Sequence, residues 1–297
     1  MRVSRLLMLC AILLVAAHGT MARAAPVAVL AAESSYGDIA RFIGGTRVKV
    51  TSIIVNANVD PHDFMPNPRD AREALEAQVI IRNGLGFDPW LGKILATRPD
   101  PRRQVIVVGE LARGLVPAER NPHIFYDPRA ALIAAAALRR AFTRVDPAHG
   151  PGYERRYIEF EQALLPVWVR IQALAARYPG ARVAATVPVY GYMLRLLGFE
   201  APFRSFRLAL MNHSSPSPKT VAAFVTALRR RRLRVLIYNP AALGPLGQRM
   251  VEIARGAGVP GVPVSPVPRP GQGYVAWQLA TLERLAAALA RGVASPR

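Results

Sequence analysis

Short apolar segments alternate with helical segments along almost the whole chain. The apolar segments expected as strands are residues 27–30, 48–54, 79–81, 105–108, 182–185, 235–238 and 262–264. Two of the intervening helical segments open with a capping residue followed by proline, at Asn67-Pro68 and Asp127-Pro128. Short buried strands separated by helices form parallel sheets. The sequence therefore predicts an α/β protein with mainly parallel sheets.

One helical segment is much longer than the others. Between residues 152 and 178, apolar side chains such as Phe160, Val167 and Ile171 recur near helical spacing. Pro166 predicts a kink within this segment. The alternation of strands and helices resumes after it. We therefore expect two β/α lobes, residues 25–148 and 180–297, joined by one long backbone helix within residues 149–179.

The first 24 residues have the order of features that is typical of a secretory signal peptide. Arg2 and Arg5 precede an apolar run over residues 6–17, and Ala22-Arg23-Ala24 provides a small-residue cleavage site. The apolar run is shorter than the roughly 20 residues that cross a bilayer. We therefore expect cleavage before Ala25 and a periplasmic location.

Cys10 is the only cysteine, and it lies inside this leader. It comes before the end of the apolar run, too early for lipid attachment. The exported chain is therefore expected to carry no lipid anchor, no disulfide and no thiolate metal ligand.

The chain is strongly basic, with a formal net charge of +20 at pH 7. Only three of its basic residues are lysines, so the charge is almost all arginine. A cytosolic protein with this charge would suggest nucleic acid. Export and the scattering of the arginines argue against such a partner. The densest run, residues 229–232, is interpreted as a solvated helix end, where cations are favourable.

Two loops contain the residues with metal-binding chemistry. His62 lies between prolines and the carboxylates of Asp60 and Asp63, and His123 precedes the capped helix that opens at Asp127-Pro128. Both loops follow strands, and ligands of open α/β sheets bind at the carboxyl ends of strands. Neutral imidazole is a common ligand for zinc, and the two carboxylates could orient His62. On spacing alone, two loop histidines are more often surface or hydrogen-bonded residues than a metal pair.

Several ordered segments resemble the zinc/manganese family of ABC-importer solute-binding proteins. In the first half they are YGDIA (36–40), DPHDF (60–64), NGLGFDPW (83–90) and NPHIFYDP (121–128). In the second half they are VPVYGYM (187–193), LMN (210–212), LIYN (236–239) and YVAW (274–277). The resemblance implies two lobes around one metal ion, and it places His62 and His123 at the two first-lobe ligand positions. It also implies delivery to an inner-membrane permease that a cytoplasmic ATPase drives.

The second lobe departs from this family pattern. The resemblance leads us to expect a carboxylate or histidine where Val187 stands, and an acid in the loop over residues 265–273, which contains none. Two imidazoles without a carboxylate disfavour a hard cation such as manganese.

Three hypotheses address this gap. His213 could supply a third nitrogen, with water completing a tetrahedron; it could equally be a residue of a Ser/Pro turn. Met65, Met193 or Met211 could lend thioethers, which would favour copper, although methionine is commonly core filler. Alternatively, the site no longer binds a free ion tightly and takes a chelated metal or another solute.

The function expected from the sequence is therefore capture of a divalent transition metal, zinc in preference to manganese, by a monomeric transport protein. Asn212 and Asn239 are further candidates for the cleft. A metal-dependent hydrolase is the alternative from another class, and Asp63 would be its only local general base. No catalytic residue is predicted, because the chain has no nucleophile elbow, phosphate loop or dinucleotide fingerprint.

Overall fold

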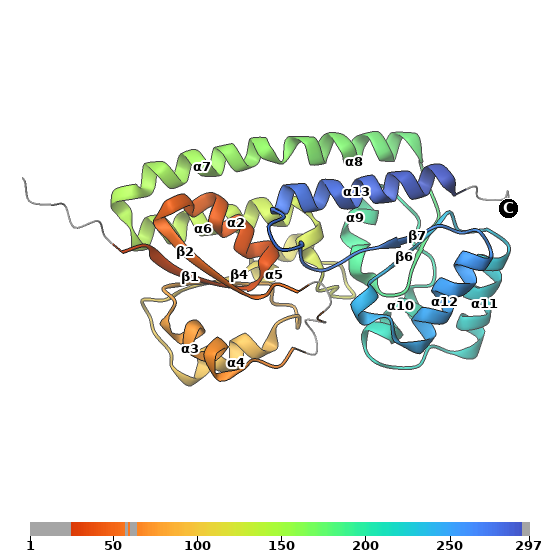
Figure 1. The fold of residues 1–297 in the computed structure, drawn as a ribbon, viewed down its shortest axis with the longest axis horizontal. Coiled ribbons are helices and arrows are strands. Elements are labelled where there is room, and N and C mark those ends of the chain that lie inside the picture. The colour runs from red at the N-terminus through yellow and green to blue at the C-terminus, as the bar shows by residue number, and fades with distance from the viewer. Residues whose placement is uncertain (1–24, 57–58, 60–63, 293–297) are drawn as a thin grey trace, which may run out of the picture.

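The computed structural model describes residues 25–56, 59 and 64–292. The expected leader, residues 1–24, lies outside this part of the chain. Within it, two α/β lobes lie side by side beneath a pair of long helices (Figure 1). No helix of the described part has the length and apolarity that a bilayer crossing would require.

The first lobe is built on a four-stranded parallel sheet in the order β2-β1-β3-β4. Its strands are β1 (Val27–Glu33), β2 (Val48–Ile54), β3 (Val79–Arg82) and β4 (Gln104–Val107). Its helices are α2 (Ser34–Gly44), α3 (Pro68–Glu76), α4 (Pro89–Thr97), α5 (Val108–Leu111) and α6 (Pro128–Val145). The parallel sheet confirms the α/β prediction, and the strands are apolar because helices cover both faces.

The second lobe has a three-stranded parallel sheet in the order β5-β6-β7. Its strands are β5 (Val183–Ala185), β6 (Val235–Tyr238) and β7 (Gly261–Pro263). Its helices are α9 (Gly191–Leu196), α10 (Arg204–Met211), α11 (Pro218–Arg229), α12 (Gly244–Gly256) and α13 (Tyr274–Arg291). A core of its own lies around Phe206, Phe224 and Leu228.

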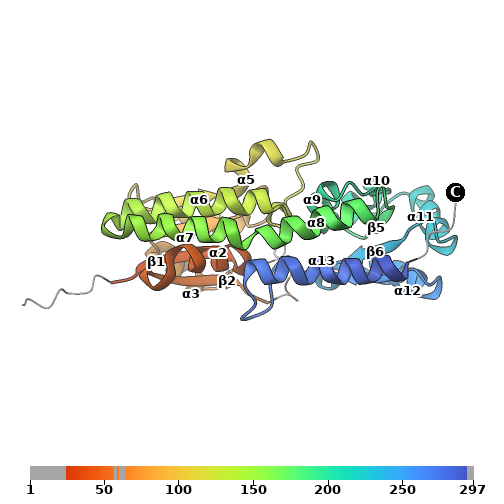
Figure 2. The ribbon, with the colours of Figure 1, turned by 90° about the horizontal axis from the view of Figure 1, so that it is seen from above.

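The backbone helix consists of two consecutive segments, α7 (Gly150–Ala163) and α8 (Leu165–Arg177), which meet at Leu164. Pro166 stands in the first turn of α8, where its missing N–H needs no acceptor. The interruption therefore falls where the proline predicted a kink. Figure 2 shows that α7 and α8 extend over both lobes and that α13 runs alongside α8.

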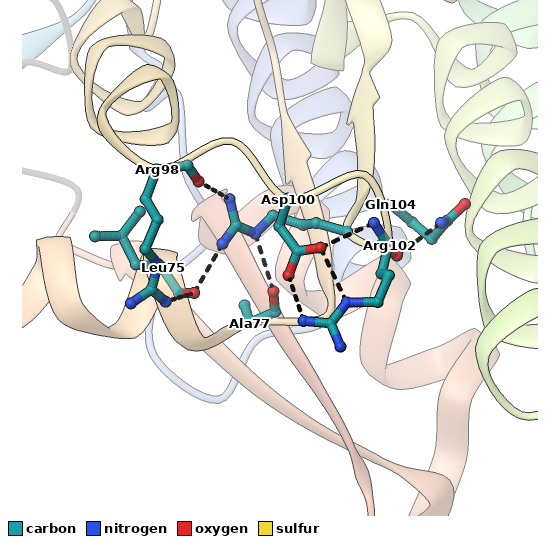
Figure 3. Close-up of polar contacts among 7 residues, drawn as sticks. Leu75, Ala77, Arg98, Asp100, Arg102 and Gln104 are labelled. Carbon is teal, nitrogen blue, oxygen red and sulfur yellow. Dashed lines mark hydrogen bonds and ion pairs between the residues drawn. The ribbon is translucent and has the colours of Figure 1, made fainter.

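Helix α3 is held at each end by hydrogen bonds of neighbouring side chains. Asn67 caps the helix: its side chain accepts hydrogen bonds from the N–H groups of Arg69 and Asp70, and the Asp70 carboxylate accepts from the Asn67 N–H. At the other end, the Arg103 guanidinium donates to the carbonyl oxygens of Leu75, Ala77 and Arg98 at 2.8, 3.3 and 3.2 Å (Figure 3). Both ends of the helix are therefore fixed by side chains.

Three buried tyrosines join the lobes. The Tyr192 hydroxyl donates to the Asn121 carbonyl oxygen at 2.7 Å, and the Tyr274 hydroxyl donates to the Phe125 carbonyl oxygen at 2.7 Å. The Tyr126 hydroxyl donates in the opposite direction, to the carbonyl oxygen of Ser265. We call these three residues the tyrosine seam. Because all three are less than 4 % exposed, the seam fixes the lobes to each other through buried hydrogen bonds.

Candidate metal centre

A cleft of about 430 Å³ lies between the two lobes. Its described lining residues come from both lobes: Phe87, His123, Val187, Leu210, Met211, His213, Ser214, Ser215, Asn239, Ala241, Ala242, Leu243, Gly244 and Pro266. Phe87, in the first-lobe wall, follows shortly after the carboxyl end of β3, the edge at which parallel α/β sheets bind ligands.

His123 is held at the base of this cleft and is only 5 % exposed. It precedes a short 3₁₀ turn, Ile124–Tyr126, and its ring packs edge-on against Phe87 and Phe125 at centroid distances of 5.6 and 5.8 Å. Its Nδ1 lies 2.8 Å from the Asn121 Oδ1. Ring packing and the hydrogen bond with Asn121 orient the imidazole, and oriented rings of this kind are found among histidines that ligate metals.

Asn121 determines which ring nitrogen of His123 carries the proton. The Asn121 Nδ2 donates to the Pro188 carbonyl oxygen at 2.8 Å, which assigns the other amide atom, facing His123, as oxygen. An oxygen there accepts from Nδ1–H, so the neutral ring has its lone pair on Nε2. Nε2 is then the atom through which His123 can bind a metal ion.

The role of Asn121 was not predicted from the sequence. Its signal was present two residues before His123, in Asn121-Pro122-His123. Asn121 is 3 % exposed and also accepts the His123 backbone N–H at 3.1 Å. The Asn121 side chain forms hydrogen bonds with His123 in the first lobe and with Pro188 in the second. The orientation of the imidazole therefore depends on how the two lobes pack together.

His213 lies in the opposite wall of the same cleft, two residues after α10 ends. The structure therefore brings His123 and His213 to one cavity from opposite lobes. His213 is exposed, and its backbone has a left-handed φ of 50°. Few non-glycine residues adopt that conformation, and here it directs the chain from α10 into the loop that lines the cleft.

The two second-lobe segments that lack the expected ligands both contribute to the cleft wall. Val187, which is 5 % exposed, lines the cleft, and so does Pro266 from the loop over residues 265–273. Neither side chain can donate an electron pair. The cleft therefore keeps the expected place for a second-lobe ligand but fills it with apolar groups.

The remaining candidates are divided among different places. Asn239 lines the cleft, whereas Asn212 faces a neighbouring hollow together with Glu119 and Arg204. Of the three methionines considered, Met211 lines the cleft, Met193 is buried in the core and Met65 is 86 % exposed.

His62, Asp60 and Asp63 lie outside the described residues, so their roles remain predictions. In the described part of the chain, no group of three or more His, Cys, Asp and Glu side chains is arranged to hold a metal ion. Burial raises the pKa of the Tyr126 hydroxyl well above its ordinary value, and it does the same for Tyr190 beside it. These phenols at the lobe junction therefore stay protonated and supply no anionic oxygen.

Two α/β lobes that are fixed to each other, with histidines from both in the intervening cleft, define a two-lobed solute-binding protein. The chain matches the family model described as zinc-uptake complex component A, periplasmic, over residues 29–288. The chain belongs to this family of metal-binding substrate-binding proteins of ABC transporters.

Relatives and solved structures agree on the fold. The chain is 23 % identical over 231 residues to the iron-binding protein YfeA of Yersinia pestis, covering 76 % of this chain and 73 % of that one. It is 26 % identical over 149 residues to the manganese-binding lipoprotein MntA of Bacillus subtilis, which covers 48 % of each chain. The periplasmic zinc-binding protein TroA of Treponema pallidum superposes with a TM-score of 0.73 at 18 % identity, covering 89 % of this chain and 99 % of that one. Because these relatives are named for iron, manganese and zinc, they do not select one metal.

Proposed function

We propose that this protein captures zinc between its lobes and delivers it to a membrane permease that a cytoplasmic ATPase drives. The observation that supports zinc most directly is the orientation of His123, whose Nε2 is presented by the Asn121 contact. Imidazole nitrogen suits zinc, whereas manganese prefers oxygen ligands. The described cleft wall offers no carboxylate, which favours zinc over manganese; copper is a further possibility through Met211.

The proposed ligand set is His62 and His123, with His213 as a third nitrogen from the second lobe. A zinc ion held by three imidazoles would accept water as its fourth ligand. We further propose that the chain acts in the periplasm as a monomer, without a lipid anchor, after cleavage of residues 1–24, and that it catalyses no reaction. Lobe boundaries at residues 25–148, 149–179 and 180–297 remain part of this proposal.

The experiment is a thermal titration of the metal-stripped protein with zinc, manganese and copper. A ligand at about 100 times its dissociation constant stabilises the native state by roughly 2.7 kcal/mol, a rise in Tm of several degrees. We expect this rise with zinc, and we expect His62→Ala, His123→Ala and His213→Ala each to reduce it.

His149→Ala is the matched control, because His149 bonds Asp146 at 2.9 Å on the first lobe and does not line the cleft. Its zinc-induced rise should equal that of the wild type. A rise that survives the His62→Ala/His123→Ala double substitution would show that zinc binds elsewhere and would reject the proposed site.

A further inference from the structure

The cleft is much larger than a bare metal ion requires. A single water molecule occupies about 30 Å³ of liquid, and an ion with one bound water needs little more. The cleft encloses about 430 Å³, which lies within the range of roughly 300–1,000 Å³ for pockets that hold small organic molecules. The space therefore admits an ion together with a small ligand of its own.

The described residues of the cleft wall also provide no compensation for the charge of a divalent ion. None of its described lining residues is Asp, Glu, Lys or Arg. Transfer of an ion from water is costly unless an opposite charge or strong ligands accompany it. The described part of the wall offers only neutral groups, so it leaves the two positive charges of the ion uncompensated in a chain that is strongly basic. A cargo that brings its own negative charge would remove this cost.

The second-lobe wall presents a hydrogen-bond donor without an acceptor. Asn239 is 4 % exposed and lines the cleft. Its Oδ1 accepts the Ala241 backbone N–H at 3.1 Å, which assigns the other amide atom as Nδ2. Among the residues that the structure describes, none accepts a hydrogen bond from this Nδ2. An amide in the cleft wall whose N–H groups no described residue accepts is suited to bind an anionic oxygen.

The amino terminus of α12 lies beside Asn239. Leu243 and Gly244 both line the cleft, and no side chain caps this 13-residue helix. In the described part of the chain, neither the Leu243 N–H nor the Gly244 N–H has a backbone acceptor. Gly244 has a φ of +56°, and a Cβ built there would meet nothing within 4 Å, so the space beside this residue is open. Free N–H groups and the positive end of the helix dipole favour an anion.

We propose that the cleft binds its divalent metal as a complex with a small polycarboxylate. This inference rests on the proposed function, because His123 remains the ligand of the metal. One carboxylate of the chelator lies against Asn239 Nδ2 and the N–H groups of Leu243 and Gly244, while others coordinate the ion. The chelator thereby supplies the negative oxygens that Val187 and Pro266 cannot provide.

Citrate is the probe that separates this inference from capture of a free ion, because it acts in opposite directions in the two cases. Citrate lowers the concentration of free zinc, so it weakens zinc binding to a protein that takes only the bare ion. We expect the reverse: at equal total zinc, excess citrate should raise the apparent affinity at least tenfold in calorimetric titrations. Citrate without metal should bind weakly or not at all.

Two variants place a carboxylate in the proposed anion subsite. Asn239→Asp converts the free amide into a negative group, and Ala242→Asp adds one next to α12 at a half-buried position that tolerates a small side chain. Both should lose the gain from citrate and bind bare zinc at least tenfold more tightly than the wild type. Asn212→Asp is the matched control, since it makes the same change of charge at an exposed residue of the neighbouring hollow. It should behave as the wild type does.

The outcomes distinguish the two levels of the argument. If bare zinc binds tightly and citrate only weakens it in proportion to the loss of free zinc, the polycarboxylate inference is overturned and the proposed function stands. If citrate strengthens zinc binding in Asn239→Asp and Ala242→Asp as much as it does in the wild type, the proposed anion subsite is wrong. If neither zinc nor zinc citrate binds, and His123→Ala behaves like the wild type, the proposed function fails as well.

Discussion

Replacing Asn121 tests whether a single amide fixes the imidazole that is proposed to bind zinc. Asn121→Ala removes the bond from Nδ2 to the Pro188 carbonyl oxygen at 2.8 Å and both contacts of Oδ1 with His123, at 2.8 and 3.1 Å. Each buried hydrogen bond contributes about 1 kcal/mol net. The free energy of unfolding should therefore fall by about 3 kcal/mol, which lowers the Tm by about 6–12 °C for a chain of this size.

The same substitution should weaken zinc binding by a mechanism that is separate from stability. Without Asn121, the His123 ring is no longer held with Nε2 toward the cleft. Loss of a partner that orients a ligating histidine typically costs 10–100-fold in metal affinity. Competition with a chromophoric zinc chelator, at a temperature where the variant is folded, measures this loss directly.

Asn121→Asp is the matched comparison. Aspartate keeps both oxygen contacts with His123 but loses the donor to Pro188. It should therefore lose stability, yet retain zinc affinity close to that of the wild type, because a carboxylate on Nδ1–H orients the ring and raises its basicity. Equal losses of zinc affinity in Asn121→Ala and Asn121→Asp would refute the reasoning. An unchanged zinc affinity in Asn121→Ala would show that Asn121 has only a structural role.

Three further predictions concern other parts of the chain. Glu33 is fully buried, and neither of its oxygens has a hydrogen-bond partner among the described residues. Burial is the main cause that raises the pKa of Glu33 well above its ordinary value, and the neighbouring Asp88 carboxyl raises it further. The unfolded chain releases this proton near pH 4.3 while the folded chain retains it, so a rise in pH above that value favours unfolding by up to about 1.4 kcal/mol per unit until the folded group also ionises. Glu33→Gln should therefore raise the Tm at pH 7 and leave it almost unchanged at pH 4; a gain that is equal at both pH values would contradict this account. Val187→Glu should raise the affinity for manganese relative to zinc, because it adds a carboxylate oxygen to the cleft wall, and titration of both metals against Val187→Gln measures the effect of the charge. Arg103→Ala should lower the free energy of unfolding by about 1–3 kcal/mol through its three lost carbonyl contacts and should leave zinc affinity unchanged, which denaturant unfolding and the chelator assay would show.

The secondary-structure pattern could be predicted from the sequence wherever one local rule dominates. A short apolar segment between two helical segments, such as Val79–Arg82, is too short for a helix and is predicted as a strand. The cap-plus-proline pairs at Asn67-Pro68 and Asp127-Pro128 mark the starts of α3 and α6. Boundaries moved where an apolar run crosses from one element into another. The expected strand over residues 105–108 is found at Gln104–Val107, because Val108 already begins α5.

The helix α10, at Arg204–Met211, was not predicted. Its amino-terminal cap is Phe203 in a left-handed conformation with a φ of 63°, which no capping side chain announces. The preceding Pro202 and the polar Arg204 and Ser205 conceal the start of the helix. This omission mattered for the site, because α10 is the element that carries the chain to His213.

The candidate site could be predicted only in part. His123, which the structure places in the cleft wall, could be named as a candidate because its segment is a local property of the sequence. Asn121, Asn239 and the amino terminus of α12 meet in or beside the cleft through packing between segments that are far apart in the chain. Hydrogen bonds such as Asn121 to Pro188 depend on the docking of the two lobes, and no spacing along the sequence encodes that docking.

The tyrosine seam has a consequence for how cargo leaves the protein. Its hydroxyls reach backbone carbonyl oxygens of the opposite lobe, so opening the cleft like a hinge would break three buried bonds at once. If the protein delivers its cargo as proposed, the work of opening would fall on the transporter rather than on thermal fluctuation of the free protein. The exposed loop around His213 lies at the cleft, where a docked permease would meet it. Release would then be an event that the partner drives, and the unaccompanied protein would lose its cargo slowly.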